Sequence, residues 1–387
     1  MKAYEIKPNV YWVGVIDWNL RNFHGYDTSR GGTYNAYLIM DEKITLIDNV
    51  YHTFTPELVE YISSVVDPAK IDIIISNHGE PDHSGSVKQL LTLAPNAKVY
   101  TSVNGEKILK AEYHDITVHA LKHNDTLSIG KRTLRFFHTP MVHWPDNMVT
   151  YDEYDCILFS NDAFGQHIAT SERLDHNYPL DTFLFELKKY YANIVLPYST
   201  QAKKALDLVK TLDIDLICPS HGLIIDHYIK ETFEAYEKMT THYKKNRAVV
   251  IYDTMWGSTE KMALAIADAF MAKGISTGVY HLTKTPESDL IVELMEASYV
   301  AIGSPTLNNG MMPTVAAFLY YIKGLRPMNL NYIAFGSYGW GGQSPNLIDQ
   351  ELEAMGHKRL LAPVRQYFVP TAEALQSLKN DVINSIN

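Results

Sequence analysis

The pattern of apolar residues changes near residue 245, and this change constrains the fold more than any other property of the chain. Beyond that residue, apolar runs of strand length alternate regularly with amphipathic segments of helical periodicity. This alternation predicts a doubly wound parallel sheet with helices on both faces. The expected strands are 248–253, 277–282, 299–303, 332–335 and 365–369, and the expected helices are 259–273, 286–295, 314–322, a helix starting near 346, and 372–386.

The first 245 residues follow a different order, in which short strands, turns and helices are mixed. Strand-like runs with interleaved helical segments suit a sandwich of two sheets covered by helices. A short polar stretch at 242–247 is typical of a linker. Because 387 residues are too many for one ordinary core, we expect two domains, 1–245 and 246–387. In the first domain the expected strands are 33–40, 43–49, 71–76, 97–101, 133–138, 148–151 and 156–160, and the expected helices are 56–66, 84–93, 181–192 and 200–212.

Composition argues against several classes of protein. Hydrophobic residues make up 46% of the chain and charged residues 20%, which is typical of a globular protein. The net charge of −10 argues against nucleic-acid binding, because that function needs a basic face. No apolar run approaches the roughly 20 residues of a transmembrane helix, and the start of the chain lacks the apolar core of a signal peptide. We therefore expect a cytoplasmic protein with no membrane partner.

The chain has two cysteines, Cys156 and Cys218, and both stand in apolar surroundings. Two residues cannot build a disulfide framework, so we expect buried free thiols. The chain also has no CxxC pair, which excludes an attached rubredoxin-type iron site or a thioredoxin-type dithiol.

The stretch His78-Gly79-Glu80-Pro81-Asp82-His83 places four metal-binding side chains within six residues. It follows the run 71–76, which is expected to be a buried strand. Loops after strands often carry chemistry, because the sheet holds them rigidly. Imidazole and thiolate suit zinc, whereas a site richer in carboxylate suits iron or manganese. Glu80 therefore favours iron over zinc.

Three more segments fit as contributors to a site with two metal ions, which needs six or seven ligands. They are 141–146 with His143, 160–165 with Asp162, and 219–222 with His221. Each segment presents a histidine or an aspartate just past an expected strand. One edge of a sheet sandwich could therefore gather all of these side chains.

The loop at 78–83 resembles the HxHxDH metal loop of the metallo-β-lactamase superfamily, with Glu80 in place of the second histidine. The four segments, in this order, resemble the flavodiiron proteins, also called A-type flavoproteins, and the resemblance covers essentially the whole chain. It implies an α/β protein in which a metallo-β-lactamase-like αββα sandwich is followed by a flavodoxin-like doubly wound parallel sheet.

The resemblance also implies a ligand set for two iron ions. It assigns His78, Glu80 and His143 to one iron, assigns Asp82, His83 and His221 to the other, and makes Asp162 the bridge between them. Three further roles stay open at this point. His24 lies in a loop that resembles a family segment near the metals, and Tyr190 or Tyr191 resembles a position from which a phenol reaches the site. Ordinary packing explains each of these three residues equally well.

The segment Thr254-Met255-Trp256-Gly257-Ser258-Thr259 lies between the first strand and first helix of the second domain. Its amides and hydroxyls, together with the helix N-terminus, suit a phosphate. It resembles the flavodoxin phosphate loop TxTGxT, except that Trp256 replaces a hydroxyl residue. Glycine-rich loops at 303–310 and 336–342 follow the third and fourth strands, where flavodoxin-like folds bind their ligand. No GxGxxG follows the strand, so FMN is favoured over a dinucleotide. The expected contacts are Thr254, Met255, Trp256, Gly257, Ser258, Thr259, Ser304, Pro305, Thr306, Leu307, Asn308, Asn309, Ser337, Tyr338, Gly339, Trp340, Gly341 and Gly342.

The resemblance implies reduction of dioxygen to water, of nitric oxide to nitrous oxide, or of both, with electrons passed through FMN. The donor would be separate, such as rubredoxin or a reduced deazaflavin. A head-to-tail homodimer, or a dimer of dimers, would place one subunit's FMN against the other's irons. Two alternatives remain: a zinc-dependent hydrolase of this fold with a fused flavodoxin module, and a flavodoxin-type carrier whose first half is a metal-free scaffold.

Overall fold

The computed structural model describes residues 2–386 and divides the chain into two compact units. The first unit comprises the residues up to Tyr191 together with Tyr198–Thr240. The second comprises Ala192–Pro197 and the residues from Thr241 onward. No helix within residues 2–386 has the length and the apolar character needed to cross a bilayer.

The first unit contains two main sheets. The larger has the order β1-β2-β7-β8-β9-β10-β11 and the smaller has the order β12-β13-β14-β15-β16. Two short two-stranded sheets, β3 with β6 and β4 with β5, lie outside them. The strands are β1 (Tyr4–Lys7), β2 (Val10–Trp12), β3 (Val15–Asp17), β4 (Asn22–Phe23), β5 (Tyr26–Asp27), β6 (Gly32–Tyr34), β7 (Tyr37–Ile39), β8 (Thr45–Ile47), β9 (Ile73–Ile75), β10 (Lys98–Ser102), β11 (Val118–Leu121), β12 (Thr126–Ser128), β13 (Thr133–His138), β14 (Met148–Asp152), β15 (Ile157–Asn161) and β16 (Leu216–Pro219).

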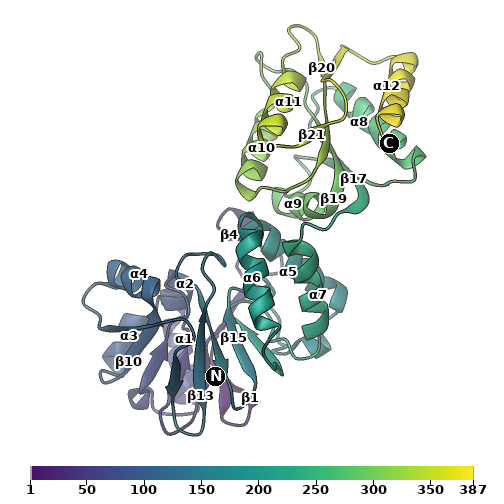
Figure 1. Ribbon diagram of the computed structural model, residues 1–387. Helices are drawn as coiled ribbons and strands as arrows, with labels where there is room; N and C mark the ends of the chain where they lie inside the picture. Colours follow the sequence, from purple (N-terminus) through teal and green to yellow (C-terminus); the bar gives the residue numbers. More distant parts are fainter. Residues whose placement is uncertain (1, 387) are drawn as a thin grey trace. The chain divides into compact units, whose positions relative to one another are not determined.

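Alternate residues of the two sheets form one core between them. Ile73 and Ile75 of β9 belong to the same buried cluster as Phe136 of β13 and Phe159 of β15. On its other face the larger sheet packs against α1, α3 and α4, and Figure 1 shows α5, α6 and α7 on the opposite side of the sandwich. This layering is the expected αββα arrangement. The helices are α1 (Thr55–Ser63), α2 (Pro81–Ser84), α3 (Val87–Leu93), α4 (Val103–Tyr113), α5 (Leu180–Tyr190), α6 (Ser199–Val209) and α7 (Ile229–Thr240).

The second unit is a parallel sheet of order β18-β17-β19-β20-β21, with β22 also paired to β20. The chain passes from β17 to β18 on one side and then to β19 on the other, so a switch point lies between β17 and β19. Its elements are β17 (Lys245–Tyr252), α8 (Ser258–Ala272), β18 (Ser276–His281), α9 (Glu287–Glu296), β19 (Ala297–Gly303), α10 (Pro313–Leu325), β20 (Asn331–Tyr338), α11 (Ser344–Ala354), β21 (Lys358–Arg359), β22 (Val364–Tyr367) and α12 (Ala372–Ser385).

The structure differs from several local expectations, and specific contacts explain two of the differences. The expected strand 33–40 is interrupted at Asn35, whose side chain accepts a hydrogen bond from Trp12 Nε1 and donates to the Pro219 carbonyl. The Asn35 backbone amide also donates to the Ser220 carbonyl at 2.8 Å, so these contacts tie this residue to the end of β16 and the residue after it instead of to a neighbouring strand. The expected linker 242–247 overlaps β17, because the backbone of Lys245 already pairs with that of Ala297.

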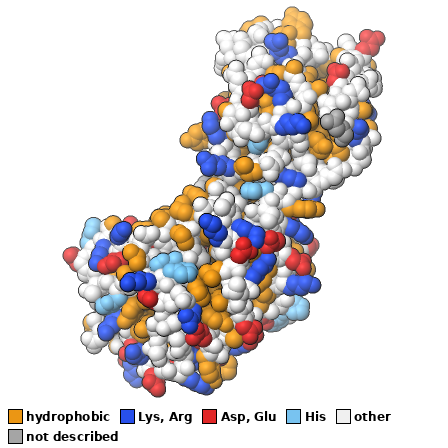
Figure 2. Space-filling view, viewed as in Figure 1, with side chains coloured by type: hydrophobic (Ala, Val, Ile, Leu, Met, Phe, Trp, Pro, Cys, Tyr) orange, Lys and Arg blue, Asp and Glu red, His pale blue; other side chains and the backbone are white. Residues whose placement is uncertain are grey.

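Charged side chains of both signs lie on the face of the molecule shown in Figure 2. On the face shown in Figure 2, lysine and arginine side chains lie among aspartate and glutamate side chains. This face therefore carries no broad basic surface, in agreement with the net charge of −10.

Candidate metal centre

The loop after β9 delivers four of the expected ligands. β9 is three buried isoleucines, and the chain then turns into the short helix α2. Glu80 precedes that helix and Pro81 starts it, which suits the fixed φ of proline at a first helical position. His78 and Glu80 therefore lie before the helix, whereas Asp82 and His83 lie in its single turn. All four side chains are buried.

The smaller sheet delivers the other three expected ligands at one edge. β13 and β15 are both antiparallel to β14, and β16 is parallel to β15, so all three strands end on the same side. His143 follows β13, Asp162 follows β15 and His221 follows β16. The order of strands in this sheet therefore gathers residues that lie far apart in the sequence.

One group of side chains comprises His78, Glu80, His143 and Asp162. Glu80 Oε2 lies 3.1 Å from His78 Nε2 and 3.2 Å from His143 Nε2. Asp162 Oδ2 lies 3.6 Å from His78 Nε2 and 3.5 Å from His143 Nε2. Two carboxylate oxygens and two imidazole nitrogens thus face a common centre.

A second group comprises Asp82, His83 and His221. Asp82 Oδ2 lies 3.3 Å from His83 Nε2 and 3.3 Å from His221 Nε2. The other oxygen of Asp162, Oδ1, lies 3.0 Å from His83 Nε2 and 3.7 Å from His221 Nε2. Asp162 therefore presents one carboxylate oxygen to each group.

These separations fit metal ions better than they fit hydrogen bonds. Ligand atoms about 2.1 Å from one ion, at ordinary coordination angles, are about 3.0–3.4 Å apart. Within residues 2–386, both oxygens of Asp82, both ring nitrogens of His83 and Nε2 of His221 are buried without a hydrogen-bond partner. Buried polar atoms are rarely left in this state. The seven side chains could hold two cations, with Asp162 between them.

The charges of the two groups depend on each other. Burial disfavours the ionised form of Asp162, but His83, His143 and His78 outweigh burial and hold the pKa of this carboxyl well below its usual range. Burial lowers the pKa of His83, but Asp82 and Asp162 outweigh burial and raise it to about 9. The Asp162 carboxylate is therefore ionised at neutral pH, as metal binding requires, and a cation bound at His83 would displace the proton of that ring.

Outer contacts fix which ring nitrogen two of the histidines present. His78 Nδ1 lies 3.1 Å from both oxygens of the buried Asp146, and Asp146 Oδ2 also accepts a hydrogen bond from the Gly79 amide at 2.7 Å. His221 Nδ1 lies 2.8 Å from the Thr33 carbonyl oxygen. Each ring therefore directs Nε2 at the centre, which is the usual support for a metal-binding imidazole. Sequence reasoning did not single out Asp146, although it stands three residues after His143.

The structure distinguishes between the three residues whose roles the sequence left open. Tyr190 is fully buried and donates a hydrogen bond to Asp162 Oδ1 at 3.0 Å. Tyr191 donates instead to Ser199 Oγ, away from the seven side chains. His24 is half-exposed, and its Nε2 lies 2.8 Å from Glu80 Oε1.

His167 is a neighbour of the centre that sequence reasoning missed. Its ring is buried beside those of His221 and Tyr190, at centroid distances of 4.7 and 5.3 Å. Burial, reinforced by the charge of His221, holds the pKa of His167 well below its usual value. The ring is therefore neutral. Only a conserved position or a solved fold could have distinguished this histidine from the others in the chain.

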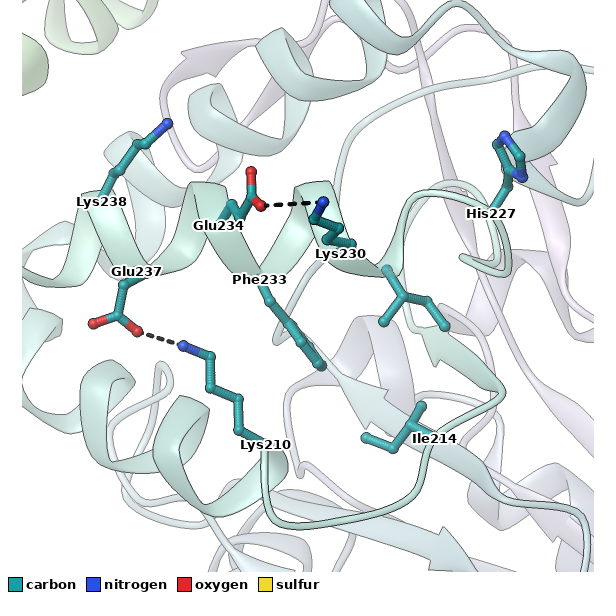
Figure 3. A pocket seen from close by; sticks show the side chains of 9 residues that line it. Lys210, Ile214, His227, Lys230, Phe233, Glu234, Glu237 and Lys238 are labelled. Atoms are coloured by element: carbon teal, nitrogen blue, oxygen red, sulfur yellow. Dashed lines mark hydrogen bonds and ion pairs between the residues drawn. The ribbon is translucent and has the colours of Figure 1, made fainter.

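Two other features of this unit do not join the centre. Asp175, His176 and Asp226 form a third cluster, but Asp175 already accepts three hydrogen bonds from the amides of Asp226, His227 and Tyr228. A cavity of about 730 Å³ lies beside α7 (Figure 3). Its charged side chains pair with each other, Lys210 with Glu237 at 2.5 Å and Lys230 with Glu234 at 3.9 Å, so they are not arranged around a ligand.

In the second unit, a cavity of about 340 Å³ lies at the carboxyl ends of the strands. Nine of the expected flavin contacts line it, from the three expected loops. Two lining residues, Phe368 and Val369 after β22, were not expected. The nine are Met255, Trp256, Ser258, Pro305, Thr306, Ser337, Tyr338, Gly339 and Trp340.

The other expected contacts do not line this cavity, and several serve the loops themselves. Thr254 Oγ1 accepts a hydrogen bond from the amide of Gly257, whose φ of 81° suits glycine. Thr259 Oγ1 and Ser337 Oγ share a hydrogen bond. Reciprocal backbone hydrogen bonds close a tight turn between Leu307 and Gly310. The remaining residues of this group are Ser304, Asn308, Asn309, Gly341 and Gly342.

Comparison with known proteins assigns each of the two units to a protein family. Residues 33–222 match the family described as ODP family beta lactamase, and residues 250–379 match the family described as Flavodoxin. These matches confirm the expected order of a β-lactamase-like sandwich and a flavodoxin-like sheet.

Three proteins resemble the chain along nearly its whole length. A rubredoxin-oxygen oxidoreductase of Megalodesulfovibrio gigas is 42% identical over 386 residues, which are 98% of this chain and 96% of that protein. A nitric oxide reductase of Moorella thermoacetica is 41% identical over 378 residues, 96% of this chain and 95% of that protein. The crystal structure of the flavodiiron protein from Giardia intestinalis has a TM-score of 0.96 and 34% identity, covering 99% of this chain and 96% of that chain.

Proposed function

The chain belongs to the flavodiiron proteins, and from this membership we propose that it reduces dioxygen to water, nitric oxide to nitrous oxide, or both. It is an oxidoreductase whose cofactors are FMN and a pair of iron ions. Reduction of one dioxygen to two waters takes four electrons and four protons. Reduction of two nitric oxide molecules to nitrous oxide and water takes two of each.

One observation carries the assignment of the site. The two oxygens of Asp162 face two separate groups of ligands, so one carboxylate can hold both ions as neighbours. We assign His78, Glu80 and His143 to one iron, and Asp82, His83 and His221 to the other. Four nitrogens and at least three carboxylates make a harder donor set than a zinc site built of imidazole and thiolate.

Two irons held by these residues would supply Lewis acidity and electrons to a diatomic gas, and bound FMN would supply the electrons that the irons need. The chain's own residues fix the geometry. Asp146 and the Thr33 carbonyl hold the rings of His78 and His221, so that Nε2 of each faces the centre. The Tyr190 hydroxyl donates to Asp162 and holds the bridging carboxylate in place. Burial of all these groups keeps bulk water away from the reacting gas.

The flavin lies in the second unit in this proposal, in the cavity lined by the loops after β17, β19 and β20. The ring would lie between aromatic side chains, and its phosphate would face the loop before α8. The donor is a separate molecule, either a rubredoxin or a reduced deazaflavin. The name of the Megalodesulfovibrio gigas relative supports rubredoxin.

The functional assembly is a head-to-tail homodimer, or a dimer of such dimers, in which one subunit's FMN serves the other's irons. Aromatic side chains at the rim of the flavin cavity support this arrangement. Trp256 is 93% exposed and Trp340 is 80% exposed. Large exposed apolar side chains around a site often mark a contact with another protein.

Two alternatives are less well supported. A zinc hydrolase with a fused flavodoxin is not favoured, because the relatives of similar length are named as oxidoreductases. A metal-free scaffold would not need seven buried side chains directed at a common centre. The cytoplasmic location stays a prediction, and cell fractionation would check it.

To test the activity, the protein is loaded with iron and FMN and mixed anaerobically with reduced rubredoxin or reduced deazaflavin. Dioxygen or nitric oxide is then added, and the consumption of that gas is measured. The His83→Ala variant should lose more than about 100-fold of the turnover while keeping FMN. His176→Ala is the matched control, because it removes an exposed histidine from the third cluster of the same unit. Undiminished turnover in His83→Ala, or turnover of neither gas by the loaded wild type, would contradict the proposal.

The dimer is tested by complementation. Asp162→Ala removes the bridging ligand, and Gly257→Asp places a negative charge in the phosphate loop, so each protein alone should be inactive. A co-expressed mixture contains dimers in which an intact flavin faces intact irons on the other subunit. Recovery of activity in the mixture supports transfer between subunits, whereas a mixture as inactive as its parents contradicts it.

A further inference from the structure

The loop after β22 reaches the flavin cavity although neither its composition nor its spacing marks it as a binding loop. Phe368 and Val369 line this cavity together with residues of the three loops discussed above. β22 is parallel to β20, with Tyr367 opposite Tyr338, and the Phe368 amide donates to the Tyr338 carbonyl at 2.8 Å. The pairing therefore places Phe368 at the carboxyl edge of the sheet, where ligands bind in this fold.

Core packing does not account for Phe368. Its side chain is 54% exposed. Its ring lies against Tyr367 at a centroid distance of 4.6 Å, and a Cβ added at Gly339 would lie 3.3 Å from the ring. The aromatic ring thus covers the backbone of Gly339, another residue that lines the cavity, and stays half-exposed.

The backbone of Phe368 is also unusual. Its φ is 49°, in the left-handed region that bulky residues rarely adopt. Glycine or asparagine would occupy this position at a lower conformational cost. Unfavourable backbone conformations are common at ligand-binding loops and active sites, where the surrounding structure holds them in place.

We propose that Phe368 is a binding residue for the flavin, forming the wall of the cavity that contacts the isoalloxazine ring. The proposal rests on the FMN function proposed above and extends the site to a fourth loop. An aromatic ring in this place contacts the flavin ring by offset stacking or by its edge. The contact involves the ring system alone, so it should contribute equally to the binding of FMN and of riboflavin.

Binding to the full-length protein stripped of its flavin tests this proposal through the quenching of flavin fluorescence. Phe368→Asn keeps a residue that tolerates positive φ and removes the ring. Its Kd should rise about tenfold, the size of one aromatic contact, for FMN and for riboflavin alike. Its thermal midpoint should be no lower than that of the wild type. Phe368→Tyr should bind FMN within about twofold of the wild type.

Three controls separate the possible outcomes. Tyr320→Asn removes an exposed aromatic of the same unit outside this cavity and should leave the Kd unchanged. Ser258→Ala, in the phosphate loop, should weaken FMN but not riboflavin. Phe368→Leu should bind less tightly than Phe368→Tyr, which keeps the comparison available if the asparagine variant does not fold.

An unchanged Kd in Phe368→Asn, or a loss confined to FMN, would overturn the proposal. If the wild-type protein does not bind FMN at all, the proposed function fails instead.

Discussion

Replacing Asp146 by asparagine should release one iron and leave the other. Asp146 is buried, and as a carboxylate it accepts from two donors, the His78 ring at 3.1 Å and the Gly79 amide at 2.7 Å. An asparagine of the same shape has one oxygen. If that oxygen takes the place of Oδ2, it can still accept from Gly79 and face His78 Nδ1, but the amide NH₂ then takes the place of Oδ1, also 3.1 Å from His78 Nδ1, and meets the ring N–H without an acceptor of its own.

The cost follows from this mismatch. A buried donor left without an acceptor costs about 1–3 kcal/mol. The ring can avoid the conflict only by moving its proton to Nε2, the nitrogen that the metal needs, so the whole cost falls on binding. Iron affinity at the site of His78 should fall about 10- to 100-fold. The site of His83 and His221 has no contact with Asp146 in the described part of the chain and should keep its iron.

The assay is anaerobic dialysis of the iron-loaded protein against increasing concentrations of a ferrous chelator, followed by counting of iron per chain. Asp146→Asn should pass through a plateau near one iron at concentrations that leave two in the wild type. Asp155→Asn is the control, because Asp155 accepts from Arg132 Nη2 at 2.6 Å, outside the centre. Retention of both irons by Asp146→Asn, or equal loss of both, would refute the reasoning.

Three further predictions follow from single contacts. Tyr190→Phe removes the hydrogen bond to the bridging carboxylate and should slow gas turnover about tenfold, whereas Tyr191→Phe should not; equal rates in the two variants would contradict this. Burial, aided by Lys244, lowers the pKa of His357 from 6.5 to about 4, so the folded state favours the neutral ring. The free energy of unfolding should therefore fall as pH drops from 6.5 towards 4, by about 2 kcal/mol between pH 7 and pH 5, and urea titrations of His357→Asn should lack that part of the loss. Phe270→Ala, in the core of the second unit, should cost about 3–5 kcal/mol in urea unfolding, and a cost below about 1 kcal/mol would show that the packing is misassigned.

The second unit was more predictable than the first for a physical reason. Buried parallel strands read as continuous apolar runs, and the helices between them have a clear period. In the first unit, β3, β4, β5 and β6 span only two or three residues each. Runs this short show no period, so β3, β4 and β5 were not expected, and β6 was expected only as the start of the longer run 33–40. The break at Asn35 depends on contacts with residues far along the chain.

The metal centre, too, was predictable only where the sequence carries a local signal. The seven side chains were predicted as ligands because their segments follow expected strands and, in this order, resemble the flavodiiron proteins, and the structure brings the seven together. Asp146 and His167 were missed because their roles depend on what lies beside them in space. Phe368 was missed because the pairing of β20 with β22 sets its position, and an aromatic residue after an edge strand carries no signal of its own.

The origin of the ligands in two different sheets has a mechanical consequence. The loop at 78–83 belongs to the larger sheet, whereas His143, Asp162 and His221 follow strands of the smaller one. Any cation held by ligands from both sheets links the two sheets, and its binding free energy includes the free energy of packing one sheet against the other. Weaker packing between the two sheets, even through a change away from the ligands such as Phe136→Ala, should therefore cause loss of iron before it causes loss of secondary structure.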